Sequence, residues 1–293
     1  MKLASYRTPK GAGYVVVMSD GIVDLTRRIG RKYPDLRALL AGGALAQAEK
    51  IAKAAKKSDL KLSKVAFLPV IPNPGKIVCV GLNYEEHRME TGRDKTENPA
   101  LFIRVAESQV GHKQPILMPP ESTNLDYEGE IAVVIGKSGR RISQENSWKH
   151  VAGYACYNDG SVRDWQRHTL QWTAGKNFSR TGGFGPWMVT RSEIADGEEL
   201  TLETRLNGQV MQHATTEQMI HRIPRLINYI SAFTTLEPGD VIVTGTPGGV
   251  GARRNPPVWM KPGDTVEIEV SKVGVLVNTI KGGDPRPRRK RDV

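Results

Sequence analysis

Hydrophobic and polar positions alternate over the first 25 residues in short runs that are typical of β-strands. We predict strands at 3–6, 13–18 and 21–25. Residues 35–57 are rich in Ala, Leu, Lys and Glu, which predicts a helix. The segment 70–75, Val-Ile-Pro-Asn-Pro-Gly, interrupts regular structure. It therefore marks the predicted end of a small N-terminal α/β domain covering residues 1–70.

After residue 75 the chain carries apolar runs that are bounded by Gly, Pro, Asn or Asp. We predict strands at 76–81, 129–136, 151–158, 201–206, 240–244 and 264–270. A helix is predicted at 223–233, where apolar residues recur at spacings of three and four: Ile223, Leu226, Ile227, Ile230 and Phe233. Many strands, few helices and no regular β–α alternation indicate a mainly β, α+β protein with mixed sheets rather than a Rossmann fold.

Composition excludes several protein classes. No apolar stretch among the 293 residues approaches the roughly 20 residues that span a bilayer. The first nine residues lack the apolar core of a signal peptide. The two cysteines, Cys79 and Cys156, lie in apolar strand-like surroundings, as buried thiols do in a reducing compartment. We therefore expect a cytoplasmic protein without membrane spans or a disulfide scaffold.

The net charge of +11 is partly local. Residues 282–293 carry five cations and two Asp and almost no apolar side chain, so a disordered tail is predicted there. Such a tail could anchor the protein to nucleic acid or another polyanion. It has no aromatic residues for base stacking, however, which favours a solvated tail. The positive remainder of the chain suits a small anionic substrate.

Three carboxylates are the most informative candidate site. Glu128 and Glu130 are two residues apart on a predicted strand, so both side chains face the same way. A bare Glu-x-Glu is usually a solvated strand edge, but here the flanking residues are apolar. Asp159 ends another apolar strand. Three carboxylates without paired His or Cys favour Mg²⁺ or Mn²⁺, and such an ion keeps coordination positions for water or substrate.

A second candidate is the His87/Glu90 pair in the segment that follows the strand at 76–81. On a helix these two residues are neighbours, and a carboxylate beside an imidazole could prepare it to activate water. The alternative is an ordinary pair on an exposed helix. Further along, Arg163 and Gln166 could hold a substrate carboxylate, although Arg163 could instead pair with Asp164.

Two further segments could contact a ligand. Lys176, in Ala-Gly-Lys-Asn-Phe, could add a second cation to the site. The glycine-rich segment 243–251 lacks the spacing of phosphate and dinucleotide loops. It is interpreted as a tight loop that brings backbone groups and the Thr246 hydroxyl close to a ligand.

Together the motifs resemble those of the fumarylacetoacetate hydrolase family, its acylpyruvase and 2-hydroxyhepta-2,4-diene-1,7-dioate isomerase-like branch. The resemblance covers about residues 75–281. It rests on motifs that occur here in order: Gly-Leu-Asn-Tyr-x-x-His-x-x-Glu, Leu-Asp-Tyr-Glu-x-Glu, Asn-Asp-x-Ser-x-Arg-Asp-x-Gln, Gly-Lys-x-Phe and Thr-Gly-Thr-Pro-x-Gly-Val-Gly. It implies a mixed β-sandwich roll with a small N-terminal α/β domain, usually assembled as a homodimer.

The resemblance also implies roles for individual residues. The metal ligands would be Glu128, Glu130 and Asp159, holding Mg²⁺ or Mn²⁺, with Ca²⁺ possible in crystals. The catalytic residues would be His87 and Glu90, which activate water under a lid, and Lys176, which stabilises negative charge. The residues that contact a small keto-acid substrate would be Tyr84, Arg163, Gln166 and Thr246.

The implied reaction is hydrolysis of a carbon–carbon bond in a 2,4-dioxo acid of the acylpyruvate or fumarylacetoacetate type, through an enolate that the metal stabilises. Oxaloacetate decarboxylation and hydroxymuconate-type isomerisation or hydration are the alternatives on the same scaffold. A protein that binds polyanions through its basic tail is the non-enzymatic alternative.

The sequence departs from the family pattern at Ser179, at 183–186 and at Arg104. These positions are expected to line the substrate pocket, and none is expected to touch a metal ligand. Substrate identity, rather than metal dependence, is therefore what the departures leave open.

Overall fold

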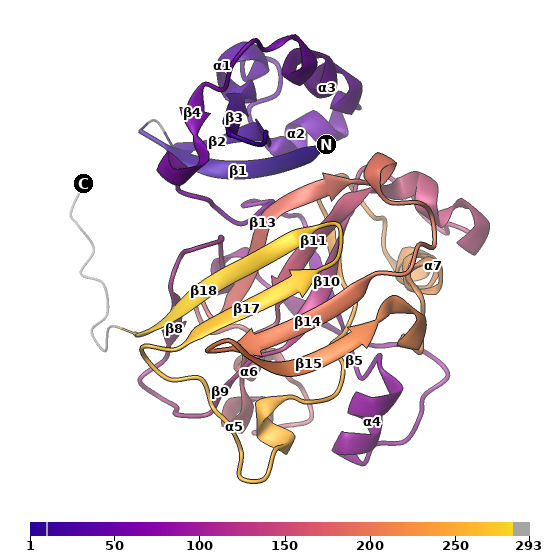
Figure 1. Ribbon diagram of the computed structural model, residues 1–293. Coiled ribbons are helices and arrows are strands. Elements are labelled where there is room, and N and C mark those ends of the chain that lie inside the picture. Colours follow the sequence, from indigo (N-terminus) through magenta and orange to yellow (C-terminus); the bar gives the residue numbers. More distant parts are fainter. Residues whose placement is uncertain (10, 284–293) are drawn as a thin grey trace, which may run out of the picture.

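A computed structural model describes residues 1–9 and 11–283 (Figure 1). Its largest element is a mixed sheet whose central strands are those predicted at 129–136 and 151–158. The strand order is β4 (Leu60–Lys61), β3 (Gly21–Asp24), β2 (Gly11–Val17), β1 (Lys2–Thr8), β13 (Gly182–Thr190), β11 (Val151–Asn158), β10 (Gly129–Ile135), β16 (Val241–Val243), β5 (Ile77–Gly81) and β6 (Ala100–Arg104), with β7 (Gln109–Val110) beside β13. The β16–β5 and β13–β7 pairs are parallel, and the other pairs are antiparallel.

A second sheet packs against one face of the first. Its order is β15 (Gln209–Thr215), β14 (Thr201–Leu206), β17 (Thr265–Val270), β18 (Gly274–Gly282) and β8 (Ile116–Met118). Because side chains alternate along a strand, β10 serves two cores. Ile131 and Val133 join the core between the sheets, whereas Ala132 and Val134 join the core on the opposite face. The predicted mainly β, mixed-sheet sandwich is confirmed.

The N-terminal helices cover that opposite face near the top of Figure 1. They are α1 (Leu25–Ile29), α2 (Leu36–Ala41) and α3 (Leu45–Ala54). The segment predicted to be helical at 35–57 forms two helices, α2 and α3, because Gly42 and Gly43 interrupt it and Gly43 has a φ of 61°. The pairing of β1 with β13, through Lys2–Val189 and Leu3–Met188, makes the N-terminal strands part of the large sheet. The division into domains at residue 70 stays a prediction.

The remaining helices lie mostly around one end of the sandwich. They are α4 (Glu85–Thr91), α5 (Arg163–Gln166), α6 (Thr173–Lys176) and α7 (Ile223–Phe233). Helix α7 has the predicted bounds, with Pro224 in its first turn and Ile227 and Ile230 buried. Phe233 was expected in its core-facing stripe, but this side chain is 58% exposed because it ends the helix at the surface.

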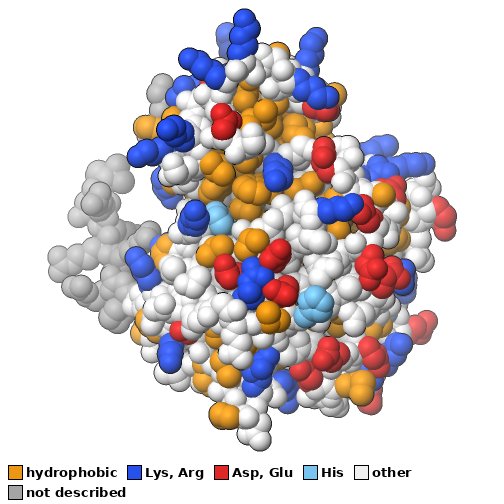
Figure 2. All heavy atoms as spheres, in the orientation of Figure 1, with side chains coloured by type: hydrophobic (Ala, Val, Ile, Leu, Met, Phe, Trp, Pro, Cys, Tyr) orange, Lys and Arg blue, Asp and Glu red, His pale blue; other side chains and the backbone are white. Residues whose placement is uncertain are grey.

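The nine predicted strands are all present, with ends that differ by one or two residues. Both cysteines are buried free thiols. Within the described ranges no helix combines the length and apolarity that a membrane span requires. Figure 2 shows basic side chains interspersed with acidic ones on one face, and not gathered over a single groove. Of the tail predicted at 282–293, Gly282 ends strand β18, and residues 284–293 lie outside the described residues.

Candidate active site

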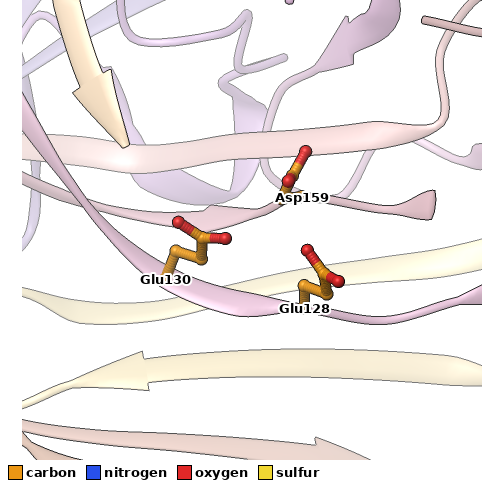
Figure 3. A group of neighbouring side chains, drawn as sticks. All are labelled: Glu128, Glu130 and Asp159. Atoms are coloured by element: carbon orange, nitrogen blue, oxygen red, sulfur yellow. The ribbon is translucent and has the colours of Figure 1, made fainter. Parts of the chain in front are cut away.

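Glu128, Glu130 and Asp159 converge at one end of the large sheet (Figure 3). Gly129 of β10 pairs with Asn158 of the antiparallel strand β11, so the start of one strand lies beside the end of the other. One carboxylate oxygen from each of the three residues lies within 4.8 Å of the other two, and all three side chains are buried. The strand positions of these residues and the family resemblance had together suggested that they form one site.

Backbone hydrogen bonds fix the positions of these residues. The Glu128 amide donates to Asn158 Oδ1 over 3.0 Å, and the Asp159 amide donates to the Glu128 carbonyl over 2.8 Å. The Gly245 amide donates to Glu130 Oε2 over 2.5 Å, which ties the carboxylate to the glycine-rich loop after β16. The loop that was predicted to approach a ligand therefore contacts the carboxylate cluster.

Three cations surround two of the carboxylates. Lys176 Nζ donates to Glu128 Oε2 and to Asp159 Oδ2, each over 2.6 Å. Arg163 Nη2 lies 2.6 Å from Glu128 Oε1, and Arg104 Nη1 lies 2.5 Å from Asp159 Oδ1. Within the described part of the chain, Glu130 forms no ion pair with a Lys or Arg side chain.

Burial and neighbouring charges shift the pKa values of Glu128 and Glu130 in opposite directions. Burial raises the pKa of Glu128, but the charges of Arg163 and Lys176 outweigh burial and hold that pKa well below its usual range. For Glu130, burial and then the charges of Asp159 and Glu128 raise the pKa well above its usual value. A buried carboxylate without a cation beside it fits a hard divalent cation, which would favour the ionised form of Glu130.

His87 and Glu90 lie on α4, and His87 lines the cavity next to the carboxylates. His87 Nδ1 is 3.2 Å from Glu90 Oε2, as expected for a helical spacing of three residues. Glu90 Oε1 accepts a hydrogen bond from the Gly249 amide over 2.6 Å. The carboxylate therefore connects the imidazole to the glycine-rich loop, and His87 Nε2 remains as the nitrogen that can exchange a proton with a ligand.

Seven of the ten predicted site residues line a cavity of about 300 Å³, and Glu90, Asp159 and Tyr84 do not. Its wall includes, among others, His87, Glu128, Glu130, Arg163, Gln166, Lys176 and Thr246. Three exposed arginines also line it, Arg93, Arg167 and Arg253, and none of them forms an ion pair within the described ranges. Phe102 and Trp172 supply aromatic surface, and the Arg93 guanidinium lies 5.5 Å from the Trp172 ring centroid.

Several predicted substrate contacts already have partners within the protein. Arg163 Nε pairs with Asp126 Oδ2 over 2.8 Å, whereas Asp164 accepts from Ser122, so the predicted alternative pair with Asp164 is not formed. Arg163 Nη1 donates to Gln166 Oε1 over 2.9 Å.

Thr246 and Tyr84 are placed differently from one another. The Thr246 hydroxyl donates to the Gly129 carbonyl over 3.0 Å and accepts from Gln212 Nε2 over 2.8 Å. This hydroxyl therefore holds the loop on β10. Tyr84 is buried away from the cavity wall, and its hydroxyl has no hydrogen-bond partner among the residues described.

Sequence reasoning missed the role of Arg104. This side chain is fully buried and contacts Asp159, so the expectation that it would touch no proposed metal ligand was wrong. Asp126 was also missed, although it stands in the Leu-Asp-Tyr-Glu motif. Its carboxylate accepts from the Gly251 and Ala252 amides, over 2.8 and 3.0 Å, and so holds a further part of the glycine-rich segment.

Asn177, beside Lys176, makes a further unpredicted contact with β6, the last strand of the large sheet. Its Oδ1 accepts from the Val105 amide over 2.8 Å, and its Nδ2 donates to the Ile103 carbonyl over 3.0 Å. The amide thereby occupies backbone groups that a neighbouring strand would otherwise bind. It also ties the segment that carries Lys176 to the strand that carries Arg104.

Comparison with known proteins agrees with this geometry. Residues 76–281 match the family model described as fumarylacetoacetate (FAA) hydrolase C-terminal. The chain is 44% identical over 223 residues to a Bos taurus protein named oxaloacetate tautomerase FAHD2A, mitochondrial, covering 75% of this chain and 71% of that protein. It is 41% identical over 247 residues to oxaloacetate tautomerase YisK of Bacillus subtilis, covering 80% and 82% respectively.

Solved structures extend the likeness to nearly the whole chain. Maleylpyruvate hydrolase from Sphingobium sp. SYK-6, solved with manganese(II) ion and pyruvate, superimposes with a TM-score of 0.80 at 28% identity, covering 97% of this chain and 100% of that one. The 5-carboxymethyl-2-hydroxymuconate delta-isomerase from Mycobacterium smegmatis gives 0.76 at 30% identity, with the same coverage. By its motifs, its fold and the family model that spans its β-sandwich, the chain belongs to the fumarylacetoacetate hydrolase family.

Proposed function

We propose that this protein is a divalent-metal-dependent enzyme that interconverts the enol and keto forms of oxaloacetate or a closely related 2-oxo dicarboxylic acid. The observation that carries the proposal is the buried cluster of Glu128, Glu130 and Asp159 at the base of a cavity lined by cations. Two relatives named oxaloacetate tautomerases support this choice of reaction within the family.

The three carboxylates would hold the metal, Mg²⁺ or Mn²⁺, and a bound ion would act as a Lewis acid toward the substrate oxygens. Lys176 Nζ, next to Glu128 and Asp159, would stabilise negative charge that develops on the 2-oxygen of the substrate. His87 Nε2 would take a proton from carbon 3, since Glu90 holds the other ring nitrogen. Return of a proton to the 2-oxygen completes the conversion to the enol.

The arginines at the mouth favour a substrate with a second anionic group. Arg167 and Arg253 line the cavity without ion-pair partners in the described part of the chain. Partial burial and then the positive charges of Arg163 and Arg253 lower the pKa of Arg167. These cations therefore repel one another at the mouth of the cavity. A carboxylate at the far end of a 2-oxo acid would reduce this repulsion.

Hydrolysis of a carbon–carbon bond in an acylpyruvate is the second candidate. The paired His87 and Glu90 favour it, because an imidazole held by a carboxylate can also activate water. Two kinds of hydrolase occur by name in the structural comparison, a fumarylacetoacetate hydrolase and a maleylpyruvate hydrolase. In this case water would attack the 4-carbonyl, and the 2-oxo acid and a carboxylic acid would leave as separate products.

A substrate panel distinguishes the candidates. Metal-stripped protein would be assayed with and without Mg²⁺ or Mn²⁺ on enol-oxaloacetate, an acylpyruvate and a hydroxymuconate. Loss of enol absorbance without release of CO₂ identifies tautomerisation, release of CO₂ identifies decarboxylation, and two fragments identify hydrolysis. Equal turnover of oxaloacetate by the wild type and Glu128→Ala, with metal present, would overturn the proposed site.

Assembly and location complete the proposal. A homodimer in the cytoplasm is the arrangement we propose, following the family resemblance and the absence of a spanning helix among the residues described. Sedimentation of the purified protein tests the assembly, and fractionation of the source cells tests the location.

A further inference from the structure

The guanidinium of Arg104 is enclosed by four residues from three segments of the chain. Besides the contact with Asp159, Nη1 donates to the Gly160 carbonyl over 3.0 Å. Nη2 donates to Thr181 Oγ1 over 3.1 Å, and Nε donates to Ser108 Oγ over 3.2 Å. The side chain is 1% exposed, so it is a component of the site's interior and not part of the cavity wall.

The packing leaves room for an arginine in this place. A Cβ on Gly182, which begins β13, would lie 3.0 Å from Arg104 Nη2 and 2.7 Å from Gln109 Oε1. The absence of a side chain at Gly182 thus accommodates the guanidinium. Because Arg104 keeps its charge at every physiological pH, it places a permanent positive charge directly behind Asp159.

Arg104 changes the charge balance of the whole cluster. The carboxylates are those of Glu128, Glu130, Asp159 and Asp126, and the cations in contact with them are Arg104, Arg163 and Lys176. With Glu130 ionised, as a bound cation would require, four negative and three positive charges leave one net negative charge. A divalent cation would change this to one net positive charge in a buried site, and an unbalanced buried charge is costly.

We propose that Arg104 couples metal binding to substrate binding: it makes the carboxylate cluster bind a divalent cation weakly alone and tightly together with an anionic ligand. This inference rests on the proposed function, because it takes the three carboxylates as metal ligands. The anionic 2-oxo acid supplies the negative charge that Arg104 has cancelled. Arg104 is thus a positioning residue that acts through Asp159 and sets the order of affinities at the site.

A purely structural role predicts the opposite sign. If Arg104 only oriented Asp159, then its removal would loosen a ligand and weaken metal binding. If its charge is what matters, then its removal leaves the cluster more negative and strengthens metal binding in the absence of an anion. The direction of the change in metal affinity therefore separates the two roles.

The test measures Mn²⁺ binding by titration calorimetry, without and with saturating oxalate. Oxalate is a stable dianion whose oxygens resemble the carboxylate and 2-oxo group of the substrate. The binding of Mn²⁺ to oxalate in buffer is measured separately and subtracted. The variants are Arg104→Gln, which removes the charge, and Arg104→Lys, which keeps it. Arg191→Gln, at an exposed ion pair with Asp196, is the matched loss of a positive charge elsewhere.

We expect Arg104→Gln to bind Mn²⁺ alone more tightly than the wild type, by about tenfold or more. The enhancement by oxalate should fall, because the positive charge that oxalate offsets in the wild type is absent from the variant, and by reciprocity Mn²⁺ should enhance oxalate binding less as well. Arg104→Lys and Arg191→Gln should keep the wild-type enhancement. Weaker Mn²⁺ binding by Arg104→Gln, or an unchanged enhancement by oxalate, would overturn the proposal.

A second variant covers the case in which Arg104→Gln does not fold, as judged by circular dichroism. Ser108→Asp places a carboxylate beside Arg104 Nε and offsets the guanidinium charge without removing it. It should shift Mn²⁺ affinity in the same direction as Arg104→Gln, and a shift in the opposite direction contradicts the charge argument. If the wild type binds no Mn²⁺ even with oxalate, then the proposed function itself fails, which is a different result from a failed coupling.

Discussion

Glu130→Gln should stabilise the metal-free protein while it abolishes stabilisation by metal. The glutamine keeps an oxygen that can accept from the Gly245 amide, so the hydrogen bond of 2.5 Å can persist. Because the pKa of Glu130 is raised, the metal-free wild type either takes up a proton there or bears repulsion between this carboxylate and those of Glu128 and Asp159, and glutamine removes both costs. At the 4.8 Å limit of their separation and an effective dielectric constant of about 20, each repulsive pair costs about 3.5 kcal/mol.

Attraction between Glu130 and Lys176 offsets part of this repulsion. We therefore expect a net gain of about 3 kcal/mol in the free energy of unfolding, which corresponds to a rise of about 5 °C in Tm for a chain of this length. Scanning calorimetry in EDTA would measure the gain. The matched control is Glu107→Gln, which removes an exposed carboxylate and should change the free energy of unfolding by less than about 0.5 kcal/mol.

Added metal should stabilise the wild type more than it stabilises Glu130→Gln. At 100 times its dissociation constant, a bound ion stabilises the wild type by about 2.7 kcal/mol. Glu130→Gln lacks the charge of one proposed ligand and should show little of this shift. A lower Tm for Glu130→Gln than for the wild type in EDTA, or the same metal-induced shift in both, would refute the electrostatic reasoning.

Three other predictions concern single side chains. His87→Asn should lower turnover by about 100-fold or more in a steady-state assay while calorimetry shows unchanged Mn²⁺ affinity. Burial and then Lys113 lower the pKa of His112 to about 4, and its Nδ1 accepts from the Val277 amide. Near pH 5, therefore, only the unfolded chain takes up a proton at His112. Urea titrations should show a free energy of unfolding that is about 1 to 2 kcal/mol lower at pH 5 than at pH 7.5, and this decrease should be smaller in His112→Asn. Arg167→Gln should raise KM for a dicarboxylate far more than for its monocarboxylate analogue; equal effects would contradict the anion-binding role.

The elements that the sequence predicted well are those with a clear internal period. The two-residue spacing of Glu128 and Glu130, at the start of β10, placed both on one side, and the stripe along α7 defined that helix. Strand β13 was missed because Gly182-Gly-Phe-Gly-Pro186 has low strand propensity. Its glycines are required by packing instead: a Cβ at Gly183 would lie 2.6 Å from Asn278 Oδ1.

The parts of the site that were missed depend on contacts between distant segments. In the sequence Arg104 only follows the apolar residues 101–103, and its partner Asp159 lies 55 residues away. Arg163 was expected to hold a substrate carboxylate or to pair with neighbouring Asp164, yet it pairs with Asp126, 37 residues earlier. A pattern along the chain shows which way a side chain points, but it does not show which charge is opposite it.

Through the amide of Asn177, the position of the segment that carries Lys176, the proposed catalytic lysine, also affects the solubility of the protein. Strand β6 ends the large sheet. Ile103 on it and Val105 just after it are 50% and 49% exposed, so an uncovered edge there would offer backbone groups and apolar surface to another molecule. Asn177 covers this edge only while the Lys176 segment is in place. A variant that displaces that segment should therefore be inactive and prone to self-association. Poor yield of soluble protein and lost turnover would then have the same cause, which is loss of the contact between Asn177 and this edge.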